Sequence, residues 1–111
     1  MSRKSVYWLG SSLKDLREFP ASARRRAGQY LELVQNGIDP IDFKRMPIVG
    51  PGAYELRIRA QGAYRVFYVA KFAEAIYVLH AFQKKTRRTG RLDIEIGAKR
   101  YRELIRRRPG F

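Results

Sequence analysis

The residues with the clearest chemical potential are cations at alternate positions of one segment. Arg57 and Arg59 alternate with apolar residues in Tyr54–Arg59, and Arg65 follows after a short break. Alternate residues of a β-strand point to the same face, so we expect Arg57 and Arg59 to share a solvent-facing surface that Arg65 joins. The arginine side chain presents a planar fork of donors that matches a phosphate group. The spacing therefore predicts a phosphate-binding face.

A second group of cations follows the apolar segment Ala75–Gln83, in the run 84–88. A curved sheet would bring this run to the same concavity as the arginines, with aromatic rings interleaved. Cations for phosphates and aromatic rings for bases are the features of a single-stranded nucleic-acid site. The alternatives are a solvated outer face for the arginines and core positions for most of the rings. The residues expected to contact RNA around the reactive centre are Arg59, Tyr68, Phe82, Arg87 and Arg88.

Cleavage of RNA by its own 2′-hydroxyl requires a base, cations that stabilise the pentavalent phosphorane, and an acid for the 5′-oxygen. Arginine cannot be the base, because the guanidinium stays protonated. A lysine crowded by other cations loses its proton more readily, which makes Lys84 and Lys85 candidates. His80 titrates near neutrality, although a structural histidine on a central strand explains it equally well. Glu55 is either a further base or the charge partner of Arg57.

The charge balance supports a nucleic-acid partner. The chain has 24 Lys and Arg residues against 10 Asp and Glu, a formal net charge of +14, and arginine outnumbers lysine 17 to 7. This balance on a small globular chain is typical of a protein that binds nucleic acid, although a generic basic surface is the alternative. With 111 residues, 45% apolar and 13% aromatic, we expect one folded domain over residues 1–111.

The composition also excludes several classes of protein. There is no cysteine and only one histidine, so we expect no disulfide, no metal site and no cofactor. The predicted cationic face carries no paired carboxylates, which argues against two-metal nuclease chemistry. No apolar run approaches the ~18–20 residues that span a bilayer, and the N-terminus lacks the apolar core of a signal peptide. We therefore expect a soluble, cytoplasmic protein with no membrane partner.

The elements that must position these residues follow from periodicity and turn residues. A short strand over 5–9 precedes two helices, over 12–19 and 21–35, that pack as a hairpin. Residues 39–53 are rich in proline and glycine and are expected to be irregular, although the length of this loop hints at a function or at a short undetected element. Strands over 54–59, 63–70 and 75–83 then form a meander, with Gln61-Gly62 in the first turn, and the third strand is the most apolar and the expected central one. A final helix over 92–107 ends at Pro109-Gly110. The order βααβββα predicts an α+β fold: a small antiparallel sheet with a helical hairpin on one face and a C-terminal helix.

Three segments carry a family resemblance: Gly50–Arg59, Tyr64–Tyr68 and Leu79–Thr86. In combination they resemble the phage-derived, HigB-like branch of the RelE superfamily of toxins, over about residues 5–105 in element order. The resemblance implies the RelE-like α+β fold and a metal-independent endoribonuclease of mRNA (an mRNA interferase) that often acts on the translating ribosome. It also implies neutralisation by a cognate antitoxin, typically a helix-turn-helix protein.

The resemblance extends to individual site residues. Arg57 and Arg65 match basic residues of RelE-type toxins, and Lys84-Lys85 matches the basic pair after the last strand, with lysine where RelE has its catalytic arginine. Glu55 stands where RelE has another cation. The tyrosine near the start of RelE's last segment has no match, since Arg91-Leu92 stands there, and the His- and Asp-rich C-terminal cluster of better-known HigB toxins is absent. The expected catalytic set is Arg57, Arg65, His80, Lys84 and Lys85. The alternatives are a non-catalytic RNA- or DNA-binding protein and an interaction module of the same fold.

Overall fold

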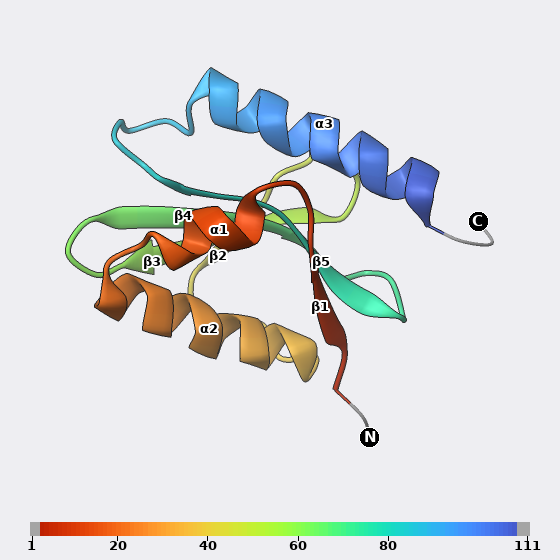
Figure 1. Ribbon diagram of the computed structural model, residues 1–111, viewed down its shortest axis with the longest axis horizontal. Helices are drawn as coiled ribbons and strands as arrows, with labels where there is room; N and C mark the ends of the chain where they lie inside the picture. The colour runs from red at the N-terminus through yellow and green to blue at the C-terminus, as the bar shows by residue number, and fades with distance from the viewer. Residues whose placement is uncertain (1–2, 109–111) are drawn as a thin grey trace.

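The computed structural model describes residues 3–108, which form five strands and three helices in the order βααββββα (Figure 1). The strands are β1 (Ser5–Trp8), β2 (Phe43–Arg45), β3 (Ala53–Arg59), β4 (Ala63–Val69) and β5 (Ala75–Gln83). The helices are α1 (Ser12–Arg17), α2 (Ala21–Gln35) and α3 (Arg91–Arg107). The predicted α+β class is confirmed. Pro109 and Gly110, expected to end α3, lie outside the described residues.

The five strands form one sheet in the order β1-β5-β4-β3-β2. The predicted meander of β3, β4 and β5 is confirmed, and Gln61 and Gly62 form its first turn with positive φ angles of 60° and 132°. One expectation was wrong. The sheet is not purely antiparallel, because β1 pairs in parallel with β5. Of the alternatives for the proline- and glycine-rich segment, the structure shows a short element: it contains β2, a strand of three residues that pairs with β3.

One face of the sheet is covered by the two N-terminal helices, as the sequence predicts. Leu16 of α1 and Ala27 and Leu31 of α2 pack in one buried cluster with Leu56 and Ile58 of β3. These strand residues are fully buried, so the apolar half of the alternating segment faces α1 and α2. Because the side-chain period of a strand is two, Glu55, Arg57 and Arg59 must face the other way.

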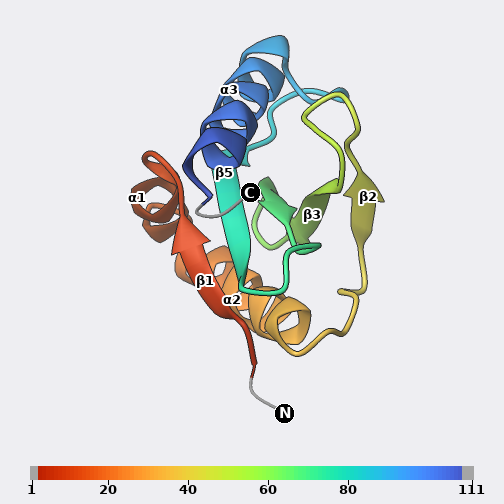
Figure 2. The same cartoon turned by 90° about the vertical axis from the view of Figure 1, so that its right-hand side faces the viewer.

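The sequence predicted that the other face would be open to solvent. In the structure α3 packs against it instead (Figure 2). Gly97 makes the close approach possible, since a Cβ there would lie 2.7 Å from the Phe67 ring. The loop between β2 and β3 extends the cover, and Tyr101 of α3 donates a hydrogen bond to its Pro51 carbonyl at 2.6 Å. The second buried cluster, between the sheet and α3, includes Phe67, Leu79, Phe82, Tyr101 and Leu104.

An irregularity in β5 determines where His80 points. The β4–β5 register changes from Phe67 opposite His80 to Tyr68 opposite Val78, so Leu79 has no partner and forms a β-bulge. Leu79 belongs to the cluster under α3, and His80 reaches Asp93 of that helix. The bulge thus directs two successive side chains to the α3 side, where simple alternation would place only one.

Within the residues that the structure describes, no helix is both long enough and apolar enough to cross a membrane.

Candidate active site

Two arginines lie side by side on the α3 face of the sheet. Arg57 of β3 and Arg65 of β4 are direct cross-strand partners. Between them lies the carboxylate of Glu55, whose Oε1 is 3.5 Å from the Nε of each arginine. Arg65 is only 4% exposed and Glu55 1%, whereas the Arg57 side chain is 32% exposed. We call Glu55, Arg57 and Arg65 the arginine cluster.

Burial shapes the electrostatics of this cluster. Burial lowers the pKa of the Arg65 guanidinium, an effect that Glu55 opposes and Arg57 reinforces. Guanidinium still carries its charge at neutral pH, because its ordinary pKa is so high. A cation that has already lost much of its water interacts more strongly with an incoming anion than a fully hydrated one. The arginine pair is therefore suited to bind a phosphate.

Both oxygens of Glu55 are occupied. Oε1 faces the two guanidinium groups, and Oε2 accepts a hydrogen bond of 2.7 Å from the Thr89 hydroxyl. Asp42, just before β2, adds a weaker contact of 3.7 Å to Arg57. Of the two roles that the sequence left open for Glu55, this geometry favours the charge partner, because neither oxygen is free to receive a proton from a ligand.

Two lysines border the arginine cluster. Lys44 of β2 lies opposite Glu55 in the register, and the backbone nitrogen of Lys84 donates to the Ala63 carbonyl at the end of β4. Burial lowers the pKa of the Lys84 ammonium, and the charge of Arg65 lowers it further. A lysine with a lowered pKa holds its proton less firmly, which is the property a general base requires. Lys85, the next residue, is exposed.

The structure separates His80 from the arginine cluster. Phe67 stands between Glu55 and His80 in the strand register, and His80 is 6% exposed. Its Nε2 lies 2.8 Å from Asp93 Oδ1, while Nδ1 is buried without a hydrogen-bond partner. Burial lowers the pKa of His80, and Asp93 opposes this effect. This geometry favours the structural role for His80, one of the two roles that the sequence left open.

The residues expected to contact RNA divide into two groups. Arg59, Arg87 and Arg88 are exposed, Arg59 at the end of β3 and the other two in the loop before α3. The two aromatic rings are buried. Tyr68 is 2% exposed on the face toward α2, and Phe82 is 8% exposed and stacks on the His80 ring at 4.8 Å between centroids. Phe82 lies opposite Arg65 in the β4–β5 register and borders the arginine cluster from below α3, whereas Tyr68 lies on the other face of the sheet.

Sequence reasoning missed Thr89, Asp42 and Lys44. Thr89 lies in a polar loop and carries no periodic signal, and its contact with Glu55 joins residues 34 positions apart. Asp42 and Lys44 lie in the segment that proline and glycine marked as irregular. Over residues 3–108 the structure shows no group of three or more His, Asp or Glu side chains placed to hold a metal ion.

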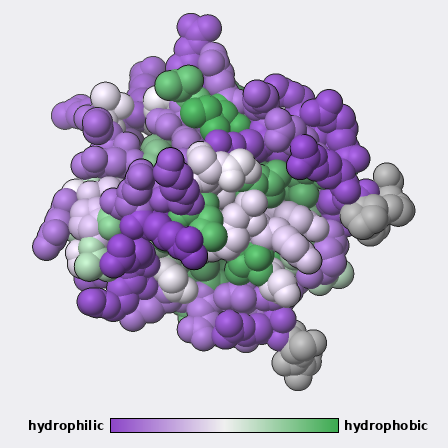
Figure 3. Space-filling model, in the orientation of Figure 1, coloured by the Kyte–Doolittle hydropathy of each residue, from purple (hydrophilic) through white to green (hydrophobic). Residues whose placement is uncertain are grey.

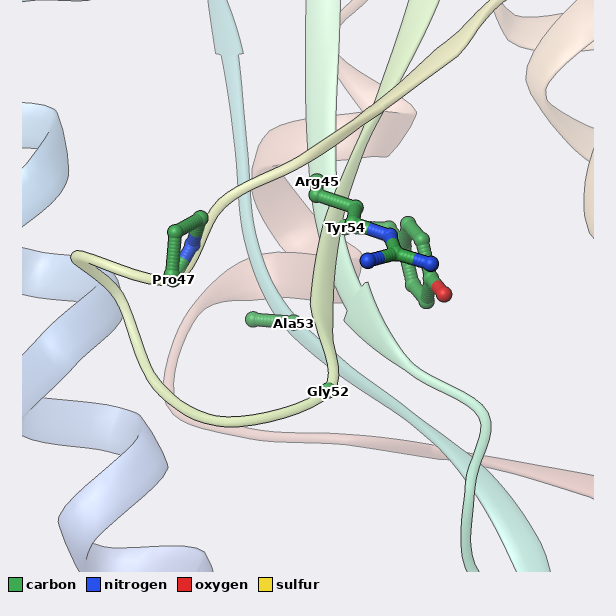
Figure 4. A pocket seen from close by; sticks show the side chains of 5 residues that line it. All are labelled: Arg45, Pro47, Gly52, Ala53 and Tyr54. Atoms are coloured by element: carbon green, nitrogen blue, oxygen red, sulfur yellow. The ribbon is translucent and has the colours of Figure 1, made fainter.

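A different feature, an open pocket of about 330 Å³, lies at the opposite end of β3 from Arg57. Its walls are Arg45, Pro47, Gly52, Ala53 and Tyr54 (Figure 4). The Arg45 guanidinium lies beside the Tyr54 ring, and no other lining residue carries a charge. This pocket has one charged lining residue, whereas several cations surround Arg57 and Arg65. We therefore assign it no role.

Comparison with known proteins identifies the family of the chain. Residues 14–102 match the family described as Phage derived protein Gp49-like (DUF891). The chain belongs to the Gp49-like family. This family lies in the RelE/HigB-like toxin–antitoxin context, in which a toxin has an antitoxin partner. No curated protein matched the chain.

The Gp49-like match spans the whole arginine cluster together with Lys84 and Thr89. Among the described elements, β1, the first two residues of α1 and the last residues of α3 fall outside it. The candidate site is thus contained in the part of the chain that defines the Gp49-like family.

Proposed function

We propose that this Gp49-like protein is the toxin of a toxin–antitoxin system and cleaves mRNA without a metal ion. The observation that carries the proposal is the cross-strand pair Arg57–Arg65, held by the buried Glu55, with Lys84 beside it. A pair of partly dehydrated guanidinium groups matches the two non-bridging oxygens of a phosphodiester. The net charge of +14 attracts the polyanion to this surface.

In the proposed reaction Lys84, in its neutral form, accepts the proton of the ribose 2′-hydroxyl. The 2′-oxygen then attacks the adjacent phosphorus, and the bond from phosphorus to the 5′-oxygen breaks. Arg57 and Arg65 stabilise the charge that develops on the phosphorane oxygens. Lys85 donates a proton to the departing 5′-oxygen. The products are a 2′,3′-cyclic phosphate and a 5′-hydroxyl, so atoms and protons balance without water or a metal.

The proposed partners are mRNA, the ribosome and a cognate helix-turn-helix antitoxin. Arg59, Arg87 and Arg88 extend the cationic surface beyond the arginine cluster and would bind phosphates on either side of the cut. A strongly basic toxin favours an acidic segment in its antitoxin, because opposite charge accelerates association. In cells, expression of the toxin alone should arrest translation.

The test uses purified protein and an end-labelled RNA of defined sequence, in buffer with chelator. Cleavage that leaves a cyclic phosphate on the upstream fragment is the expected result. A 5′-phosphate on the downstream fragment would indicate attack by water and overturn the mechanism. RNA that binds but stays intact, both alone and on translating ribosomes, would instead favour a non-catalytic binding protein.

A further inference from the structure

An open pocket of about 620 Å³ lies beside the arginine cluster, on the side of α3. The loop between β2 and β3, the loop before α3, and the first turns of α3 form its walls. Ile48 and Ile94 provide apolar surface, and Ile48 is 67% exposed. Large apolar side chains left exposed in a hollow, with polar residues around them, are typical of a binding site.

Thr89 connects this pocket to the arginine cluster. It lines the pocket, and its hydroxyl donates the hydrogen bond of 2.7 Å to Glu55 Oε2. The other carboxylate oxygen of Glu55 lies 3.5 Å from both Arg57 and Arg65. A chain whose phosphate is bound by the two arginines would therefore place its neighbouring nucleotide at this pocket.

The remaining lining residues provide the polar chemistry that a nucleotide requires. Arg88 and Arg91 are exposed cations at the rim. Glu95 lines the same pocket with a side chain 57% exposed, and its Oε1 accepts from Arg91 Nε at 3.0 Å. A carboxylate accepts hydrogen bonds and donates none, so it pairs with the exocyclic amino group of a base. Uracil has no such group, and the two carbonyl oxygens that flank its N3–H repel a carboxylate.

We infer that this pocket binds the base of a nucleotide adjacent to the scissile phosphate, and that Glu95 selects bases carrying an amino group over uracil. The inference rests on the proposed function for its substrate. Ile48 and Ile94 contact the apolar faces of the base, Glu95 reads its edge, and Arg88 and Arg91 bind the flanking phosphates. On the face of the molecule that Figure 3 shows, hydrophilic side chains surround smaller apolar patches.

The experiment compares two pocket variants with matched controls elsewhere. Ile48→Ala removes the exposed apolar wall, and Ile38→Ala is its control, since Ile38 is 54% exposed next to α2 and lines another hollow. Glu95→Gln keeps the shape of the edge-reading side chain but adds donors, and Glu18→Gln, at the residue that caps the C-terminus of α1, is its control. All four residues are partly or fully exposed, so circular dichroism should show a folded protein in each case.

Two measurements are made on each protein. The first is the base preference on either side of the cut, from sequenced cleavage products of a randomised RNA. The second is binding of an RNA with 2′-deoxyribose at the cleavage site and 2-aminopurine at each position in turn, which cannot be cut and reports base burial by fluorescence. We expect the native protein to bury one flanking base and to disfavour uracil there. Ile48→Ala should lower kcat/KM about tenfold, as for the loss of an apolar contact in a specificity pocket.

The outcomes separate the pocket from the reaction. Loss of discrimination against uracil in Glu95→Gln, with both controls unchanged, supports the inference. If the native protein cleaves RNA, and Ile48→Ala and Glu95→Gln both keep its base preference, the pocket inference is wrong. The proposed function is then unaffected. If the native protein binds RNA without cutting it, the proposed function fails and the fluorescence change still decides the pocket. If it binds no RNA, both are wrong, and an apolar side chain of a partner protein becomes the alternative occupant.

Discussion

Arg57 and Arg65 lie directly opposite each other on β3 and β4, so the register of one hairpin places two like charges side by side. Like charges in direct cross-strand positions destabilise a sheet. Glu55 offsets this repulsion, because its Oε1 lies 3.5 Å from both guanidinium groups. Asp42 adds a second carboxylate 3.7 Å from Arg57, and Lys44 and Lys84 at the border of the cluster keep the surroundings of the pair positively charged.

The first prediction concerns the role of this pair in cleavage. Arg57→Ala removes one cation that contacts the phosphate, and loss of such a donor typically costs on the order of 10²–10³ in rate. Because the Arg57 side chain is 32% exposed, the fold should be retained. Arg25→Ala, an exposed position on α2, is the matched control and should cleave at nearly the native rate. Single-turnover cleavage by both variants checks this, and equal rates in the two would contradict the site.

Arg65 requires a different variant, because the structure corrects the expectation that it is a solvent-facing side chain. Its removal would leave the buried Glu55 short of a partner, and breaking a buried ion pair typically costs ~3–5 kcal/mol. We therefore expect Arg65→Ala to lower the free energy of unfolding strongly in urea denaturation. Arg65→Lys keeps the charge but loses the planar fork, so it should stay folded and cleave more slowly.

The second prediction concerns the contact between Thr89 and Glu55. Thr89→Val keeps the shape of the side chain and removes the hydroxyl, which leaves an oxygen of Glu55 without its donor. Such a buried unsatisfied group costs ~1–3 kcal/mol. Cleavage should slow through kcat, because the arginine cluster loses its alignment, while KM changes little. Thr89→Ser restores the donor and should recover both properties, and a Thr89→Ser protein as impaired as Thr89→Val would contradict this role.

The third prediction concerns the pH dependence of cleavage. If neutral Lys84 is the base, kcat/KM should rise with pH up to the pKa of Lys84, which burial and Arg65 hold below the ordinary 10.5. Lys84→Arg keeps a cation that cannot lose its proton at these pH values, so it should remove this rise and lower the rate. Rate profiles from pH 6 to 10 on the same RNA test the idea. A Lys84→Arg profile parallel to the native one would assign the proton to another group.

The fourth prediction concerns the stability of the pair His80–Asp93. Burial lowers the pKa of His80 below the 6.5 of the unfolded chain, so the unfolded state binds a proton more readily than the folded state. The free energy of unfolding should therefore fall as pH drops below about 6.5 and be fully retained above it. His80→Gln should flatten this part of the stability curve. Urea titrations between pH 5 and 8 measure it, and cleavage activity in folded His80→Gln distinguishes a structural histidine from a catalytic one.

Much of the fold follows from local patterns in the sequence. The alternation of Leu56 and Ile58 with Glu55 and Arg57 determined which side of β3 faces the helical hairpin, because a strand has a period of two. Gln61 and Gly62 marked the hairpin turn that brings Arg57 opposite Arg65. Residue types and their spacing were thus sufficient to predict that Arg65 shares a face with Arg57.

The environment of that pair depends on contacts between distant parts of the chain. An antiparallel sheet can leave one face in water, so alternation alone cannot show that α3 covers the second face and buries Arg65 and Glu55. The β2 strand has only three residues, too few for a periodic signal, and it forms because its backbone pairs with β3. Pairing of this kind depends on a partner strand and not on local propensity.

The position of His80 shows the same limit at a single residue. The sequence identified it as the one side chain that titrates near neutrality, but its direction depends on the bulge at Leu79. A bulge adds one residue to a strand and changes the face of every residue beyond it, and its presence follows from packing against both neighbouring strands and α3. Sequence therefore determined which side chains can do chemistry, and tertiary structure decided which of them meet, because burial and alignment arise only when distant segments pack together.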